Sequence, residues 1–148
     1  DMGEEIIQLY QKHFGLKASI ARFYNVYGPH QLTEGGYTTL IGRWINNIEN
    51  GLPCEIYGDG EQRRDFTHVD DIVNGLLLAG SNIRNQEFQL GTGEDYSILE
   101  IAAAFDHHIE FIEARRGDRP RGLADISTTK EVLGYEPTYN IIDYIKSL

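Results

Sequence analysis

The sequence lacks several features that would assign a protein to a particular class. Its 148 residues include a single cysteine, Cys54, so no disulfide can form within the chain. No apolar run approaches the roughly 18 residues that a membrane-spanning helix needs. The first residues also lack the charged, apolar and small-residue zones of a signal peptide. We therefore expect a cytoplasmic protein without a membrane partner.

Clustered metal ligands and excess positive charge are also missing. No spacing of cysteine and histidine matches a zinc site, and the adjacent His107 and His108 fit a solvated surface pair better than two ligands, so we expect no metal. Thirteen lysines and arginines stand against twenty-three aspartates and glutamates, which gives a net charge of -10. Because nucleic acids and anionic membranes attract positive charge, this balance argues against both as partners.

The length of the chain suffices for one domain with a core, since a chain of this size buries about two thirds of the surface that it exposes when unfolded. Apolar residues recur at helical spacing in some segments and alternate with other residues elsewhere. This periodicity predicts helices over residues 2–14, 37–50, 97–105 and 127–133 and from about residue 69 onward, an apolar-periodic tail over 141–148, and strands over residues 17–25, 53–57, 87–91 and 109–113.

The first of these strands is the feature around which the chain is organised. It stops at Asn25, and a Gly28-Pro29 turn prevents it from continuing. In open α/β sheets, ligands bind beyond the carboxyl ends of the strands, so an asparagine at such an end is a candidate ligand contact. An ordinary strand followed by an ordinary turn would have the same pattern, and these residues leave both interpretations open.

The arginines of this acidic chain are grouped rather than scattered. The planar guanidinium donates two parallel hydrogen bonds and stays ionised, which suits it to phosphate. Grouped arginines therefore predict a small anionic ligand, although ion pairs with neighbouring carboxylates such as Asp65 and Asp118 are the alternative. The two groups contain Arg63 and Arg64, and Arg115, Arg116, Arg119 and Arg121.

The segment over residues 58–65 is predicted to be a polar loop. It begins with Gly-Asp-Gly, which permits a tight turn but is not a dinucleotide fingerprint, because that needs three glycines opening a helix directly after a strand. Thr67 and Asp70 are spaced like a helix capping box. Arg64 and Asp65 would then lie in a loop directly before a helix, a position that suits ligand contact.

A second capping box gives the most complete local signal in the chain. Ser97 and Glu100 have the spacing of the box, and Tyr96 and Ile101 have the spacing of a hydrophobic staple. This combination predicts a helix that begins at Ser97.

Several motifs, taken together and in order, resemble the NAD-dependent nucleotide-sugar epimerases and dehydratases, which are extended short-chain dehydrogenase/reductases with UDP-glucose 4-epimerase as a familiar member. The resemblance covers essentially the whole chain and is carried by R-F-Y-N-V-Y-G-P, I-Y-G-D-G-E-Q-R-R-D-F-T-H-V-D-D-I, Q-L-G-T-G with Y-S-I-L-E-I, A-R-R-G-D-R-P and A-D-I-S-T-T-K-E-V-L-G-Y-E-P.

The resemblance implies an α/β fold that corresponds to the carboxyl-terminal half of such an enzyme. This half is the substrate-binding lobe together with the last strands and helices of the Rossmann sheet. We expect residues 1–25 to be a remnant of the Rossmann domain, a helix and a strand, and residues 26–148 to form the substrate-binding lobe. Residues from about 67 to 92 are expected to return to the Rossmann side.

The family's redox machinery has no counterpart in this sequence. Family members hold NAD with a glycine-rich loop and use a Tyr-x-x-x-Lys pair, and the sequence contains neither. The resemblance therefore implies no catalytic residue here, NAD as the cofactor of the complete enzyme, and no NAD binding by this chain alone. We expect the chain to be incomplete and inactive by itself.

The resemblance assigns binding roles to individual positions. It implies that Asn25, Arg64 and Arg115 contact the substrate diphosphate, that Tyr57 lies beside the nucleotide base, that Asp118 lies near the ribose, and that Phe23 presents backbone near the nicotinamide. The family usually has Arg-Pro-Gly-Asp where this chain has Arg-Arg-Gly-Asp. The sequence therefore leaves open whether Arg115 or Arg116 faces the ligand.

These positions imply a partner of one chemical class, a nucleotide-diphosphate sugar. The function implied is the substrate-binding part of an NAD-dependent sugar 4-epimerase. The alternatives are a fragment of a nucleotide-sugar 4,6-dehydratase, or a non-catalytic assembly or binding module of a split or truncated enzyme. The resemblance also implies that helix 2–14 contributes to a dimer interface and that strands 18–24 and about 87–90 add to the large sheet. Without the first lobe these faces would be exposed, so we expect a homo-oligomer, or docking to a separate NAD-binding lobe.

Overall fold

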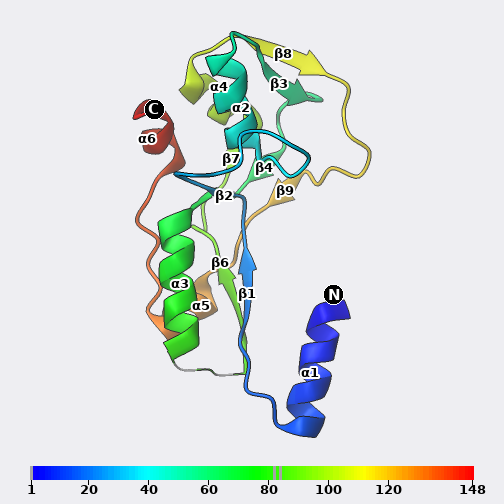
Figure 1. The fold of residues 1–148 in the computed structure, drawn as a ribbon, viewed down its shortest axis with the longest axis vertical. Coiled ribbons are helices and arrows are strands. Elements are labelled where there is room, and N and C mark those ends of the chain that lie inside the picture. The colour runs from blue at the N-terminus through cyan, green and yellow to red at the C-terminus, as the bar shows by residue number, and fades with distance from the viewer. Residues whose placement is uncertain (1, 82, 84) are drawn as a thin grey trace.

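The computed structural model describes residues 2–81, 83 and 85–148, and its fold is α/β (Figure 1). The helices are α1 (Met2–Phe14), α2 (Leu40–Glu49), α3 (Val69–Ser81), α4 (Ile98–Phe105), α5 (Ser127–Leu133) and α6 (Ile141–Lys146). The strands are β1 (Ile20–Phe23), β2 (Val26–Tyr27), β3 (Cys54–Tyr57), β4 (Arg63–Arg64), β5 (Thr67–His68), β6 (Glu87–Leu90), β7 (Tyr96–Ser97), β8 (Ile109–Ile112) and β9 (Arg121–Gly122).

A parallel pair of strands, β1 and β6, forms one end of the molecule (Figure 1). Its register runs from Ile20 opposite Glu87 to Phe23 opposite Leu90. The helices α3 and α5 contact β6 and each other, so the pair is covered on this side. The buried residues of this core are Ile72, Leu90, Ala124, Ile126 and Tyr135.

A second parallel pair, β3 and β8, lies at the other end of the molecule with α2 and α4 beside it (Figure 1). Cys54 and Ile56 alternate with less buried residues along β3, as a strand with one covered face requires. Trp44 of α2 is fully buried, and its indole N–H donates to the Glu55 carbonyl at 3.2 Å. This larger core also holds Tyr27, Ile41, Phe66, Ile98, Ile101, Ala102, Ile141 and Ile145.

Short strands connect the two ends, and two of them contradict the sequence prediction. Residues 58–65 were expected to form only a loop, but Arg63 and Arg64 form β4, which pairs with β7 on one side and β9 on the other. The strand β9 likewise lies at the end of the second arginine group, where no strand was predicted. Two-residue strands have no periodicity, and only pairing with distant segments stabilises them.

The predicted capping box at Thr67 and Asp70 is wrong. Thr67 belongs to β5, and its hydroxyl donates to the Asp65 carboxylate at 3.3 Å. The backbone N–H of Asp70 donates instead to Nδ1 of His68 at 3.2 Å, so a ring nitrogen satisfies this donor at the start of α3.

The capping box at Ser97 is confirmed. The Ser97 hydroxyl accepts the Glu100 N–H at 3.1 Å, and the Glu100 carboxylate accepts the Ser97 N–H at 2.6 Å. The helix α5 has the predicted bounds, whereas α2 begins at Leu40 because the Thr39 side chain caps it. The first strand ends at Phe23, and Asn25 lies between β1 and β2.

The helix α1 contacts the remainder of the molecule mainly through polar groups. None of its residues is buried, and Met2, Ile6, Leu9, Tyr10 and Phe14 are exposed. Arg22 of β1 donates to both carboxylate oxygens of Glu4, at 2.8 and 2.7 Å, and thereby ties the helix to the strand. None of the described helices is long and apolar enough to cross a membrane.

Candidate functional site

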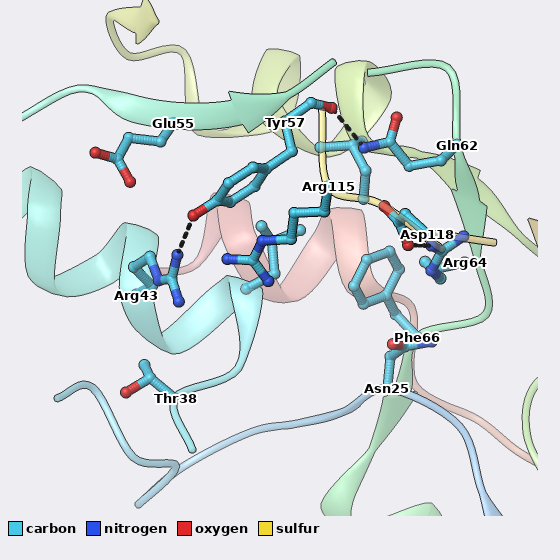
Figure 2. A pocket seen from close by; sticks show the side chains of 12 residues that line it. Asn25, Thr38, Arg43, Glu55, Tyr57, Gln62, Arg64, Phe66, Arg115 and Asp118 are labelled. Carbon is cyan, nitrogen blue, oxygen red and sulfur yellow. Dashed lines mark hydrogen bonds and ion pairs between the residues drawn. The ribbon is translucent and has the colours of Figure 1, made fainter. Parts of the chain in front are cut away.

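A pocket of about 200 Å³ lies between β3, α2, β4 and the loop that carries Arg115 and Asp118 (Figure 2). It lies beyond the carboxyl end of β1, where ligands bind in open α/β sheets. Five of the six residues predicted from the sequence line it, namely Asn25, Tyr57, Arg64, Arg115 and Asp118; Thr38, Leu40, Arg43, Glu55, Gln62, Phe66 and Ile98 complete the lining.

The sixth predicted residue, Phe23, lies in an adjoining pocket. That pocket is more open, has a volume of about 740 Å³, and shares Asn25, Arg64 and Asp118 with the first. Phe23 is the last residue of β1 and is 51% exposed there, at the end of the strand where Arg22 is exposed as well. The two pockets adjoin at the three shared residues and are together called the depression; Tyr57 lines the first pocket and Phe23 the second.

Arg64 is held in the shared part of this depression. One terminal nitrogen donates to the carbonyl of Arg63 at 2.8 Å, and the other donates to the Asp118 carboxylate at 2.5 Å. The Arg64 side chain is 17% exposed, whereas that of Asp118 is 40% exposed. The ion-pair interpretation of the grouped arginines is therefore right for Asp118.

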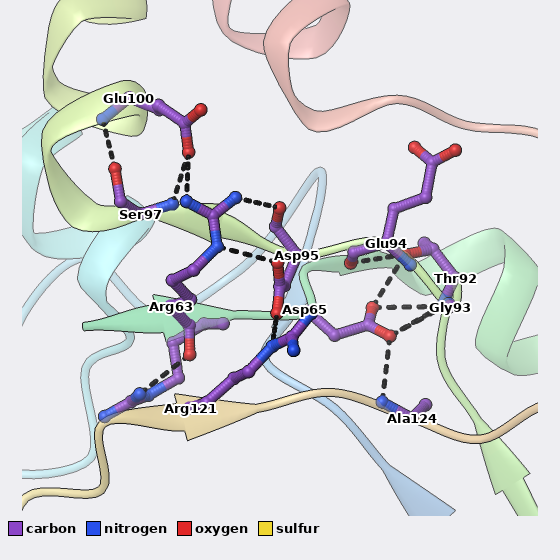
Figure 3. A network of polar contacts seen from close by, with 11 residues as sticks. Arg63, Asp65, Thr92, Gly93, Glu94, Asp95, Ser97, Glu100, Arg121 and Ala124 are labelled. Carbon is purple, nitrogen blue, oxygen red and sulfur yellow. Dashed lines mark hydrogen bonds and ion pairs between the residues drawn. The ribbon is translucent and has the colours of Figure 1, made fainter. Parts of the chain in front are cut away.

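That interpretation is wrong for Asp65, which is fully buried and belongs to the support of the site (Figure 3). Its carboxylate accepts the backbone N–H groups of Thr92 at 2.9 Å, Gly93 at 3.0 Å and Ala124 at 3.3 Å. Its carbonyl accepts the side-chain amide of Asn25 at 2.9 Å. One residue therefore connects the end of β4, the loop after β6 and the candidate ligand contact Asn25.

Arg115 lies over the aromatic face of Tyr57, with its guanidinium carbon 3.7 Å from the ring centroid (Figure 2). The terminal nitrogen of Arg43 donates to the Tyr57 hydroxyl at 3.4 Å. These cations, first Arg115 and then Arg43, lower the pKa of the Tyr57 phenol because they stabilise its phenolate. Arg116 is not among the lining residues, so Arg115 is the arginine that faces the pocket.

A separate ionic network holds the strand that carries Arg64 (Figure 3). The Asp95 carboxylate, whose side chain is 6% exposed, accepts from Arg63 at 2.8 Å and also from Arg121. Both arginines lower the pKa of Asp95, with Arg121 the larger cause. Arg63 and Arg121 lie opposite each other in the β4–β9 pairing, so this carboxylate fastens two strands together.

Sequence reasoning missed Arg43 and Glu55 as lining residues. A signal for Glu55 was available, since it lies two positions before Tyr57 on a strand and so shares its face of the sheet. Arg43 is surrounded in sequence by the apolar residues of α2, and no local pattern marks it as a ligand contact. Among the described residues, no group of histidine, cysteine, aspartate and glutamate is placed to hold a metal ion.

Comparison with known proteins finds a matching family. The family model described as "NAD dependent epimerase/dehydratase family" matches residues 2–98. A putative UDP-glucose 4-epimerase of Methanocaldococcus jannaschii is 33% identical over 151 residues, which cover 98% of this chain and 48% of the relative. The chain therefore spans between about a third and a half of the length of the curated relatives that it matches.

Solved structures have the same fold as this chain. A UDP-glucose 4-epimerase from Thermotoga maritima, crystallised with UDP-glucose, superimposes with a TM-score of 0.90 at 30% identity, over 97% of this chain and 48% of that one. A dTDP-glucose 4,6-dehydratase from Streptomyces venezuelae with NAD bound gives a TM-score of 0.87 at 25% identity, over 97% of this chain and 46% of that one.

Proposed function

The chain belongs to the NAD-dependent epimerase/dehydratase family, and we propose that it forms the part of an NAD-dependent sugar 4-epimerase that binds the nucleotide-diphosphate sugar. One observation carries this proposal. Asn25, Arg64 and Asp118 line both pockets, so one elongated ligand can extend from the first pocket into the second. In this proposal residues 26–148 are the substrate-binding lobe, with residues 1–25 and about 67–92 on the Rossmann side.

The ligand that fits this depression has an anionic middle and two uncharged ends. In the proposed arrangement its diphosphate lies between Arg64 and Arg115, because guanidinium groups bind phosphate oxygens through paired hydrogen bonds. Its nucleoside extends toward Tyr57 and its sugar toward Phe23. A phosphate that binds Arg64 competes with Asp118 for the same nitrogen, which leaves the Asp118 carboxylate free to accept a ribose hydroxyl.

The residues of this chain fit only one end of NAD. Phe23 is exposed at the end of β1 and borders the larger pocket, which suits the nicotinamide. The printed sequence has no glycine-rich loop after a strand that would hold the pyrophosphate. Bound in the complete enzyme, NAD would accept a hydride from the sugar C4 and return it. Here the chain's own residues bind and orient the sugar nucleotide.

A nucleotide-sugar 4,6-dehydratase and a non-catalytic binding module would use the same diphosphate contacts. We propose that the 148-residue chain alone neither binds NAD nor turns over a sugar nucleotide, because its sequence contains neither a glycine-rich NAD loop nor a Tyr-x-x-x-Lys pair. Measurable conversion of a UDP-sugar by the purified chain with added NAD would contradict this.

Calorimetric titration of the purified chain with UDP, dTDP, GDP and their sugars tests the binding proposal. Arg64→Ala and Arg115→Ala should each make the binding free energy of the bound ligand less favourable by about 1.5 to 3 kcal/mol, the range for a hydrogen bond to a charged group. Arg116→Ala is the matched control, since it removes the same charge from the next residue, which does not line the pocket. Equal losses in the Arg115 and Arg116 variants would show that only net charge matters and would overturn the proposal.

A further inference from the structure

We propose that Arg43 and Glu55 recognise the nucleobase by hydrogen bonds to its edge. This recognition selects bases that carry a ring N–H beside a carbonyl, such as uracil, thymine and guanine. This inference rests on the proposed function, since it assumes that the nucleoside lies beside Tyr57. Neither residue belongs to a motif that identified the family, and both line the smaller pocket.

The two side chains lie at the end of the pocket that is remote from Arg64 and Asp118 (Figure 2). Arg43 extends from α2, and Glu55 extends from β3 on the same face as Tyr57. The backbone of Glu55 is fixed by the Trp44 indole, which donates to its carbonyl at 3.2 Å, and by the pairing with Glu110 of β8. The scaffold beneath the carboxylate is therefore rigid.

Neither charge is neutralised within the described part of the chain. Arg43 and Glu55 form no ion pair with each other or with another described residue. The bond from Arg43 to the Tyr57 hydroxyl, at 3.4 Å, is long for an N–H···O bond and leaves other guanidinium donors unused. The same end of the pocket thus presents a cationic donor and an anionic acceptor, each from a different element, near the aromatic ring of Tyr57.

A planar base with a carbonyl and a ring N–H on one edge satisfies both groups. Its carbonyl oxygen accepts from Arg43, and its N–H donates to Glu55. Uracil, thymine and guanine have such an edge. In the same orientation, cytosine and adenine would place a bare ring nitrogen against the Glu55 carboxylate and an amino group against the Arg43 guanidinium. A site with polar groups left unpaired rejects the ligand that cannot pair them.

The test is calorimetric titration of the purified chain with inorganic pyrophosphate, UDP, GDP, CDP and ADP. We expect UDP and GDP to bind about tenfold or more tightly than CDP and ADP, which corresponds to one lost hydrogen bond to a charged group. Pyrophosphate has no base, so its affinity reports on the phosphate contacts of Arg64 and Arg115 alone. If the four nucleotides bind with equal affinity and pyrophosphate also binds in its own titration, the inference is overturned and the proposed function stands. Binding of none of the five overturns both.

Glu55→Gln gives a sharper test, because the amide keeps the shape of the side chain but can present either a donor or an acceptor. We expect the selectivity ratio to fall to about twofold or less, while the affinity for pyrophosphate stays unchanged. A purely electrostatic role for Glu55 would shift all five ligands by one common factor, and that result counts against the inference. Glu110→Gln is the matched control, since it removes the same charge from the register partner, which does not line the pocket.

Arg43→Gln provides an independent variant. It should lower the affinity for UDP and GDP about tenfold and the affinity for pyrophosphate much less, since the lost contact is to the base carbonyl. Thermal unfolding of each variant checks that the fold is retained. A parallel loss of pyrophosphate and UDP affinity would assign Arg43 to the phosphates and overturn its role at the base.

Discussion

At the scale of single residues, the chemistry of the candidate site is concentrated around Tyr57. Its ring lies beneath the Arg115 guanidinium, and its hydroxyl accepts from Arg43. Two cations next to one phenol stabilise the phenolate form, so the tyrosine is also a reporter of where those cations lie.

Arg115→Ala should raise the pKa of Tyr57, because Arg115 is the larger of the two causes that lower it. The measurement is the absorbance titration of tyrosinate, with Tyr57→Phe used to identify the contribution of this tyrosine. Arg116→Ala should leave the transition where it is in the unmodified chain. A Tyr57 transition that does not move in Arg115→Ala would mean that the guanidinium does not lie over the ring in solution.

Gly91 shows how closely the support of the site is packed. A Cβ added at this position would collide with Ala124 and would lie 2.7 Å from Oδ2 of Asp65. Both neighbours are buried, and Asp65 also holds Asn25. A side chain at residue 91 must therefore displace the Asp65 carboxylate, which accepts the backbone N–H groups of the loop after β6.

Gly91→Ala should lower the free energy of unfolding by about 1–3 kcal/mol, the usual cost of overpacking. Urea denaturation measures this change. Gly80→Ala is the control, because Gly80 lies in α3 with open space around it, and alanine is the better helix former there. A Gly91→Ala variant as stable as the unmodified chain would show that Asp65 can shift freely.

At the scale of elements, the strand β4 determines where Arg64 lies. Neighbouring side chains alternate across a strand, so Arg63 points away from the pocket when Arg64 points into it. Arg63 is bonded to Asp95, which also binds Arg121 of β9. This ionic network therefore holds the register of the strand that carries a proposed phosphate ligand.

Asp95→Asn should lower the free energy of unfolding by about 2 kcal/mol near neutral pH, since it removes hydrogen bonds between charged groups. The pKa of Asp95 is lowered in the folded chain, so its contribution is complete above the ordinary aspartate pKa of about 3.9 and is lost as the pH falls through the folded value. The difference between the variant and the unmodified chain should therefore shrink in acid.

Chemical denaturation at a series of pH values measures that difference. Glu94→Gln is the matched control, because Glu94 is the neighbouring acid, is exposed, and forms no ion pair with another described residue. A stability difference for Asp95→Asn that stays constant down to strongly acidic pH would rule out the ionic explanation.

At the scale of the whole molecule, α1 stands apart as the one described helix in which no residue is buried. Most of its apolar residues are exposed, and Glu4 and Arg22 join it to β1 through an ion pair. Apolar patches of this kind mark interaction sites in most proteins. We propose that this face is covered by a second copy of the chain or by a separate NAD-binding lobe.

The purified chain should self-associate, and replacing Leu9 and Phe14 together by aspartate should lower its mass in light scattering toward that of a monomer of 16.8 kDa. The substituted residues are 52% and 72% exposed, so the change costs little packing within the chain. Glu5→Gln on the same helix is the control and should leave the mass unchanged. A monomeric unmodified chain would contradict cover by a second copy and would leave the separate lobe as the partner.

The sequence alone predicted those elements whose stabilising interactions are local. The Ser97–Glu100 capping box lies within four residues, and the alternation of Cys54 with Ile56 lies within one strand, so each could be read from neighbouring letters. The resemblance to a family supplied the six candidate ligand contacts. It did so from short ordered motifs rather than from any knowledge of how they converge.

Only the tertiary structure decided what depends on distant partners. The strand β4 exists because residues 96–97 and 121–122 pair with it, and Asp65 is buried because the loop after β6 supplies its donors. Arg115 faces inward because it lies over the ring of Tyr57, and Arg43 and Glu55 reach the pocket because α2 packs against β3. A sequence orders neighbours along the chain, whereas a binding site consists of residues that folding brings together from far apart.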